Sequence, residues 1–188
     1  HIADRSLPGT FMYMAVWYCI AYLLYTDSEG PAFSQWIIAV SAVITAASII
    51  RVAMIWLAKK YLAQANISQY CLIAGLTISS LSWGGMAACA FLDTPLSTHS
   101  EIILLSTVGL CGGGAISFSS SRFFTWLFLS CMLIPILVVE IVFTQGMQIE
   151  IVMVVVVYFI GLLGATKNPH REYMSALISN FQLEEISN

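Results

Sequence analysis

Charged side chains are scarce in this chain of 188 residues, at 9% of the sequence, whereas soluble domains average about 25%. Hydrophobic residues make up 59%. A helix needs roughly 20 apolar residues to cross the hydrocarbon core of a bilayer, and the sequence holds six apolar runs joined by short links. These features exclude a soluble globular domain. The predicted fold class is all-α, a polytopic membrane bundle of six transmembrane helices.

The sequence also lacks the motifs of common enzymes and of nucleic-acid-binding proteins. It has no phosphate-binding loop and no basic stripe with interleaved aromatic residues. The five cysteines lie in apolar runs without C-x-x-C spacing, which favours packing over disulfide or metal roles. His99 lies near Asp93 and Glu101, but no three-ligand catalytic set exists. We therefore assign no catalytic residue, no metal and no cofactor to the chain itself, and no nucleic acid as a partner.

The basic residues gather on alternate links between the runs. They are Arg5, Arg51, Lys59, Lys60, Arg122, Lys167 and Arg171. The intervening links carry acids such as Asp27 and Glu29. Lys and Arg in short loops mark the cytoplasmic side of a membrane protein. We therefore predict that both termini are cytoplasmic (N-in and C-in).

The six helices are expected at about residues 10–25, 33–57, 69–92, 101–120, 123–143 and 149–165. Pro8 and Gly9 are expected at the start of the first helix. Arg51 should snorkel to the inner interface, and Pro135 should kink the fifth helix.

A polar segment follows the sixth run. Met174, Leu177 and Phe181 recur there at helical spacing, which predicts an amphipathic cytoplasmic helix. Pro169 precedes this helix and would either break its coupling to the membrane or act as the hinge. The expected division is a transmembrane domain over residues 1–166 and a linker or signalling helix over residues 167–188.

Small residues recur at four-residue spacing in three of the runs, as in close helix packing. They are Ser80, Gly84 and Ala88 in the third run, Gly109, Gly113 and Ser117 in the fourth, and Gly161 and Ala165 in the sixth. The run 112–114 of three glycines goes beyond packing needs, because each glycine weakens a helix by about 1 kcal/mol relative to alanine. It suggests a flexible or ligand-facing break in the fourth helix.

Six residues are candidate ligand contacts: Glu140, Trp83, Trp17, Tyr22, Trp36 and Gly113. Glu140 is the acid well inside a run, and such residues are functional candidates by default; the alternative is a carboxylate that reaches the outer interface. A buried Trp83 would need a hydrogen-bond partner for its indole N–H, and it is either a pocket wall or a core residue. The aromatic side chains of the outer halves line an apolar pocket or form an interfacial belt.

The order of these features is familiar. Trp36 is followed fifteen residues later by Arg51, then by Leu-Ser-Trp-Gly at 81–84, a glycine-rich fourth run and a fifth run with Pro135. This order resembles the six-helix sensor modules at the N-terminus of bacterial sensor histidine kinases and diguanylate cyclases. The segment 181–188, Phe-Gln-Leu-Glu-Glu-Ile-Ser-Asn, is similar to the one that precedes a GGDEF cyclase domain.

The resemblance implies a sensory module, or receptor domain, of the bacterial inner membrane, in contact with the lipid bilayer and acting as a homodimer. A small apolar or amphipathic ligand would enter between the outer halves of the helices and shift the sixth helix. The output would be a diguanylate cyclase that makes cyclic di-GMP from GTP with Mg²⁺. The alternatives are a histidine kinase output and a small transporter or channel.

Overall fold

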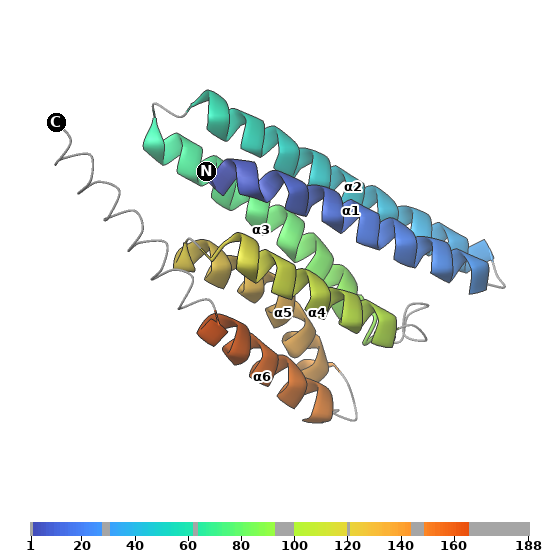
Figure 1. The fold of residues 1–188 in the computed structure, drawn as a ribbon. Coiled ribbons are helices and arrows are strands. Elements are labelled where there is room, and N and C mark those ends of the chain that lie inside the picture. The colour runs from blue at the N-terminus through green and yellow to red at the C-terminus, as the bar shows by residue number, and fades with distance from the viewer. Residues whose placement is uncertain are drawn as a thin grey trace, which may run out of the picture.

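The computed structural model describes residues 2–27, 31–61, 64–92, 100–119, 121–143 and 149–165. The described residues form six helices and contain no strand (Figure 1). The helices are α1 (Ile2–Asp27), α2 (Pro31–Lys60), α3 (Ala65–Cys89), α4 (Ser100–Ser117), α5 (Arg122–Val142) and α6 (Ile149–Ala165). The predicted all-α class is confirmed. The helices α1 to α5 are long and apolar enough to cross a membrane, and α6 is a shorter apolar helix.

The first three helices differ most from the expected boundaries. Helix α1 begins at Ile2 instead of residue 10 and contains Pro8. The expected start was wrong because a proline removes a single backbone hydrogen bond, and the apolar sequence after it continues the helix. Helix α2 extends to Lys60, and α3 begins at Ala65 instead of residue 69.

Several sequence-based predictions fall on residues outside the described ranges. They concern the signalling helix with Pro169, Met174, Leu177 and Phe181, and the loop with Asp93 and His99.

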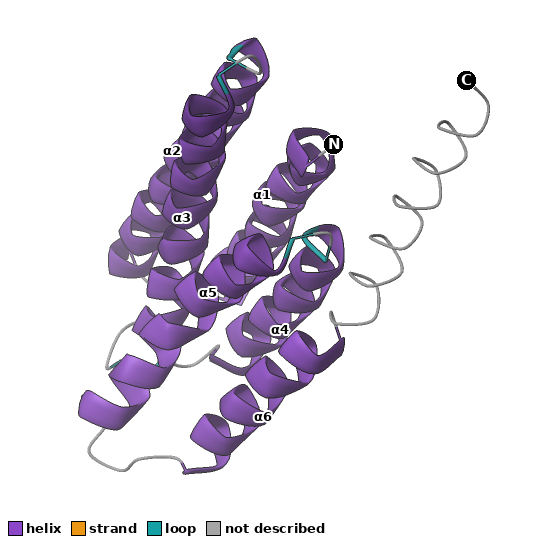
Figure 2. Ribbon diagram, turned by 90° about the vertical axis from the view of Figure 1, so that its left-hand side faces the viewer, coloured by secondary structure: helices purple, strands orange, loops and turns teal. Residues whose placement is uncertain are grey.

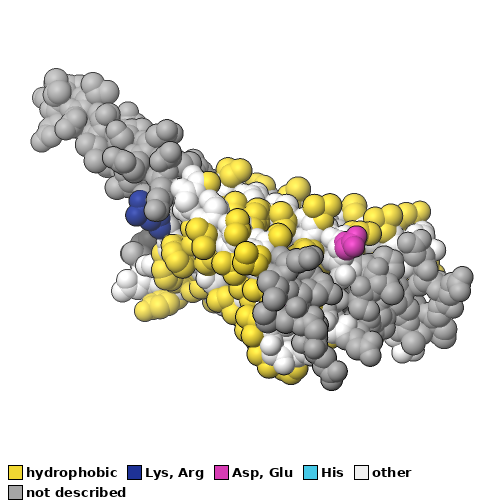
Figure 3. Space-filling model, turned by 90° about the horizontal axis from the view of Figure 1, so that it is seen from below, with side chains coloured by type: hydrophobic (Ala, Val, Ile, Leu, Met, Phe, Trp, Pro, Cys, Tyr) yellow, Lys and Arg dark blue, Asp and Glu magenta, His cyan; other side chains and the backbone are white. Residues whose placement is uncertain are grey.

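Consecutive helices run in alternating directions, so the links α2–α3 and α4–α5 lie at the same end of the bundle as the N-terminus (Figure 1). Lys59 and Lys60 end α2, and Arg122 begins α5; we call this the basic end. Glu101 lies in the first turn of α4, at the opposite end. Large hydrophobic side chains are exposed along the helices between the two ends, as the yellow surface of Figure 3 shows. Such an exposed apolar surface is what a lipid-embedded bundle needs.

Helix α3 lies at the centre of the bundle. It packs most extensively against α2 and α5, and α1 packs against α2 and more loosely against α4. Helix α6 lies at the periphery, where it contacts α5 and α4 (Figure 2). The bundle therefore has two halves, α1–α3 and α4–α6, which α3 and α5 join.

The contact between α3 and α5 depends on a small residue, as the four-residue spacing predicted. Ser80, Gly84 and Ala88 are all buried on α3. A Cβ atom added to Gly84 would lie 2.8 Å from the backbone oxygen of Met132 on α5. A glycine is required here because a larger residue would push two helix backbones apart.

We expect the substitution Gly84→Ala to destabilise the bundle by about 1–3 kcal/mol, the usual cost of overpacking. Thermal unfolding of the purified protein in detergent measures the change. Gly85→Ala is the matched control, because a Cβ there meets no atom within 4 Å. Equal loss of stability in the two variants would show that the close approach of α3 and α5 is not the cause.

Candidate functional site

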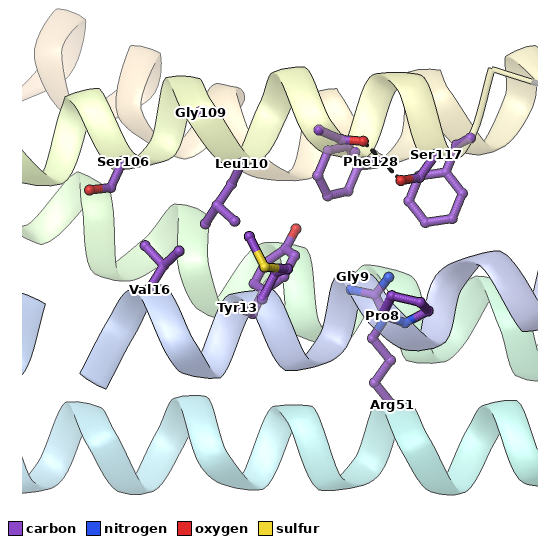
Figure 4. A pocket seen from close by; sticks show the side chains of 14 residues that line it. Pro8, Gly9, Tyr13, Val16, Arg51, Ser106, Gly109, Leu110, Ser117 and Phe128 are labelled. Carbon is purple, nitrogen blue, oxygen red and sulfur yellow. Dashed lines mark hydrogen bonds between the residues drawn. The ribbon is translucent and has the colours of Figure 1, made fainter. Parts of the chain in front are cut away.

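A cavity of about 420 Å³ lies between α1 and α4, with contributions from α2 and α5 (Figure 4). Its volume falls within the range of about 300–1,000 Å³ that is usual for small-molecule pockets. Along α1 it extends from Pro8 to Val16, which is the half of this membrane-length helix nearest the basic end.

The burial of the lining residues shows where the cavity opens. Its rim is exposed and consists of Pro8, Met12, Gly109 and Gly113. Its floor is buried and includes Tyr13, Arg51, Leu110, Phe118 and Phe128. The opening therefore lies on the outer surface between α1 and α4. In a membrane this surface faces the acyl chains of the lipid.

Among the described residues, Arg51 is the charged one at the floor of the cavity. Its Nη1 donates a hydrogen bond to Ser79 Oγ at 3.1 Å, and its Cζ lies 5.4 Å and 6.0 Å from the ring centroids of Tyr13 and Phe118. Both distances are within the range of cation–π contacts. Among the described side chains, its polar neighbours are hydroxyl groups and not carboxylates.

The prediction that Arg51 snorkels to the interface is wrong, because its side chain is only 2% exposed. Lys60 lies nine positions further along α2, which is roughly 14 Å of helix rise. Its guanidinium instead contacts Ser79 and the rings of Tyr13 and Phe118 inside the bundle.

The first helix makes room for this guanidinium. Figure 4 shows Arg51 reaching from α2 toward Pro8 and Gly9 of α1. A Cβ atom on Gly9 would lie 3.8 Å from Arg51 Nη2, so a longer side chain at this position would compete with the guanidinium for space. The Pro-Gly pair, which the sequence suggested as a helix start, instead borders the charged end of the cavity.

Trp83 supports the cavity wall from behind. Its ring is fully buried, and its Nε1 donates a hydrogen bond to Thr107 Oγ1 at 3.0 Å. The ring packs edge-on against Tyr13, with 5.7 Å between the centroids. Tyr13 lines the cavity and donates its hydroxyl hydrogen to Met132 Sδ at 3.2 Å. Trp83 is therefore a core residue that positions Tyr13, and it does not line the cavity itself.

The three glycines of α4 have three different surroundings. A Cβ on Gly112 would lie 3.2 Å from the Tyr158 hydroxyl of α6, and one on Gly114 would overlap the ring of Phe128 on α5. A Cβ on Gly113 would meet no atom within 4 Å, because this residue borders the cavity. Consecutive residues of a helix point about 100° apart, so each glycine serves a different side of α4.

Two predictions about α4 need correction. The expected break is wrong, because α4 is helical from Ser100 to Ser117. The stripe of Gly109, Gly113 and Ser117 was expected to pack closely on another helix, but it borders the cavity. Sequence spacing identifies a face of small residues but not whether a helix or a space lies opposite.

The six candidate ligand contacts lie in different places, and Gly113 is the one that lines this cavity. Trp17 is fully buried and donates its Nε1 hydrogen to Ser41 Oγ at 2.8 Å. Trp36 is half-buried against the core. Tyr22 is 68% exposed on the bundle surface, where an interfacial belt would place it.

Glu140 and Pro135 lie on α5, outside the cavity. Glu140 is 1% exposed, so its carboxylate belongs to the bundle interior in the half far from the basic end. Helix α5 stays helical through Pro135, which borders an apolar groove of about 470 Å³ between α3 and α5. These two residues belong to a different part of the bundle from Arg51.

Sequence reasoning missed Arg51, Tyr13, Phe118 and Phe128 as residues of the site. For Arg51 a signal was available, because its distance from the end of α2 exceeds the reach of its side chain. The three aromatic residues gave no such signal, since their spacing fits an ordinary apolar helix face.

No protein-family model, curated protein or solved structure matches the chain. The function of the cavity must therefore be argued from its own geometry. It combines an apolar wall, an opening toward the lipid and a buried cation, and these are the elements of a small-molecule binding site.

We expect the substitution Arg51→Met to leave the bundle at least as stable as the original protein. A charged arginine at the centre of a membrane helix costs about 2.5–3.5 kcal/mol. Its neighbours keep other bonds, since Ser79 Oγ also donates to Leu76 O at 3.0 Å and Tyr13 donates to Met132.

Thermal unfolding in detergent tests this expectation, with Arg122→Met at the exposed start of α5 as control. An ordinary hydrogen bond contributes about 1 kcal/mol to stability. If Arg51→Met alone lowered the free energy of unfolding by more than this, the guanidinium would be a structural element.

Proposed function

We propose that the chain is a membrane-embedded sensory domain. It binds an apolar or amphipathic molecule in the cavity between α1 and α4 and passes the signal through α6 to a cytoplasmic output domain. The cavity supports this proposal. It has the volume of a small-molecule site, opens sideways between α1 and α4, and is lined by the buried Arg51. Intramembrane ionisable residues are rare outside functional sites.

The contact between α4 and α6 supports a route for the signal. The Tyr158 hydroxyl of α6 donates a hydrogen bond to the backbone oxygen of Val108 on α4. The missing side chain of Gly112 lets this hydroxyl approach the α4 backbone. Helix α4 therefore has the cavity on one face and α6 on another. A ligand that favours one packing of α4 would shift the position of α6.

The proposed orientation places the basic end, and with it both termini, in the cytoplasm of a bacterium with the bundle in its inner membrane. The grouping of Lys59, Lys60 and Arg122 at one end supports this orientation, because basic residues stay on the cytoplasmic side. The cavity then lies in the cytoplasmic half of the membrane, and not between the outer halves of the helices.

The proposed output is a diguanylate cyclase domain that uses GTP and Mg²⁺ and works in a homodimer. The resemblance of segment 181–188 to the sequence before GGDEF domains supports this choice. The coding sequence after Asn188 decides between outputs: a GGDEF domain favours the cyclase, and a phosphoacceptor-histidine helix favours the kinase. A transporter would instead need a path open to both sides, whereas the cavity between α1 and α4 occupies one half of the bundle.

We expect reporter fusions to show the proposed topology. Green fluorescent protein fused after Lys60 should fluoresce, because this end faces the cytoplasm. Alkaline phosphatase fused in the link after Asp27 should be active, because that link faces the periplasm. Exchanging the two reporters is the control and should abolish both signals. The reverse pattern would overturn the orientation and, with it, the cytoplasmic output.

We expect Tyr158→Phe to uncouple the cavity from the output. In cells that produce the full-length protein, cyclic di-GMP should change when Gly113→Leu fills the cavity. The same change should be much smaller in a Tyr158→Phe background, because residues on one coupling route act non-additively. Tyr70→Phe, at a residue 71% exposed on α3, is the matched control and should be additive. Additive effects of Tyr158→Phe would contradict coupling through this contact.

A further inference from the structure

We infer that the cavity binds an anionic amphiphile, an acid group on a single hydrocarbon chain. The acid group would contact Arg51, and the chain would lie along Tyr13, Leu110 and Val16. This inference deepens the proposed sensory function and rests on it for its physiological meaning, but the binding site can be tested on its own.

The charge of the ligand follows from the surroundings of Arg51. A guanidinium stays positively charged and has five N–H donors in a planar fork, which matches a carboxylate or a phosphate group. One of these donors bonds to Ser79 Oγ, and the residue also lines the cavity. The described neighbours supply hydroxyl groups and aromatic rings but no negative charge. An anionic group in the cavity would supply charge-assisted hydrogen bonds that the described side chains around Arg51 do not.

The orientation of the ligand follows from the positions of the lining residues. Arg51, Gly9 and Ser117 lie at the part of the cavity nearest the basic end, whereas Val16 and Ser106 lie deeper along α1 and α4. A ligand with its acid group at Arg51 would point its chain toward the middle of the membrane. A lipid of the leaflet at the basic end has the same orientation. The ligand could therefore enter sideways between α1 and α4 without turning over.

The α4 side of the cavity leaves room for an alkyl chain. Gly109 and Gly113 form the rim on α4, and an added Cβ at either would meet no atom within 4 Å. The missing side chains therefore leave open space on this face of α4. This space suits a free single-chain acid, or one chain of an anionic bilayer lipid whose other chain stays outside. Both share the same chemistry, an acid group on an alkyl chain.

The test measures binding of three probes with the same tail to the full-length protein in phosphatidylcholine nanodiscs: dodecanoate, dodecanol and dodecylammonium. We expect dodecanoate to bind at least about tenfold more tightly than dodecanol, since a hydrogen bond to a charged group is worth about that factor. Dodecylammonium should bind most weakly, because its charge repels Arg51. Equal binding of dodecanoate and dodecanol would overturn the inference.

Three variants locate the site. Arg51→Met should weaken dodecanoate about tenfold or more and leave dodecanol unchanged. Gly113→Leu should weaken both probes, because its side chain fills the cavity, and Gly109→Leu serves as a second filling variant if the first does not fold. Gly161→Leu, on α6 and in open space, is the matched control and should change neither. Unchanged dodecanoate binding in folded Arg51→Met would also overturn the inference.

A second arm identifies the source of the ligand. In nanodiscs that contain phosphatidylglycerol, weaker dodecanoate binding that depends on Arg51 would identify an anionic bilayer lipid as the competitor. Unchanged binding would identify a free single-chain acid. Measuring cyclic di-GMP in parallel separates the two proposals. Binding without any change of output would retain the site and overturn sensing, whereas a change of output after Gly113→Leu without dodecanoate binding would retain sensing and overturn the ligand class.

Discussion

Hydrocarbon supplies no hydrogen-bond partners, so each polar group in the interior of this bundle has to find its partner within the protein. The two buried indole rings do so across helices, Trp83 with Thr107 and Trp17 with Ser41. Tyr158 reaches a backbone oxygen of α4. Arg51 brings a charge into this interior, and the described side chains around it supply hydroxyl groups and aromatic rings. Among the described interior groups, Ser80 Oγ lacks a hydrogen-bond partner, and Arg51 is a buried cation that borders a cavity.

Glycines determine where the helices can approach each other and where they cannot. Gly84 lets α3 contact the backbone of α5, and Gly75 places α3 against α2, where an added Cβ would lie 3.0 Å from Met54 Cβ. On α4, Gly113 does not bring two helices into contact but borders the cavity. The difference lies in the neighbours. Lipid-embedded helices associate through packing and not through the hydrophobic effect, so small residues can create either a contact or a cavity.

Much of the fold followed from the sequence, because membrane helices are predictable from length and apolarity alone. The bounds of α4, α5 and α6 differed little from expectation, and the basic links lie at one end as the charge pattern required. The site was less predictable, because its residues meet only in three dimensions. The role of Trp83 depended on Thr107, 24 residues away on another helix. The surroundings of Arg51 depended on Ser79 of α3 and Tyr13 of α1, which lie on other helices.

Helix α4 explains how such a site could act at a distance. It is the wall that the cavity and α6 share, and its three adjacent glycines keep it thin on the sides facing Tyr158 and Phe128. Helix α4 contacts α6 less extensively than it contacts α1 and α5. In the proposed sensory mechanism, a ligand in the cavity would displace α4, and α6 would follow through the contact of Tyr158 with Val108. Coupling of this kind needs one helix with two discrete positions, and no continuous chain of contacts through the core.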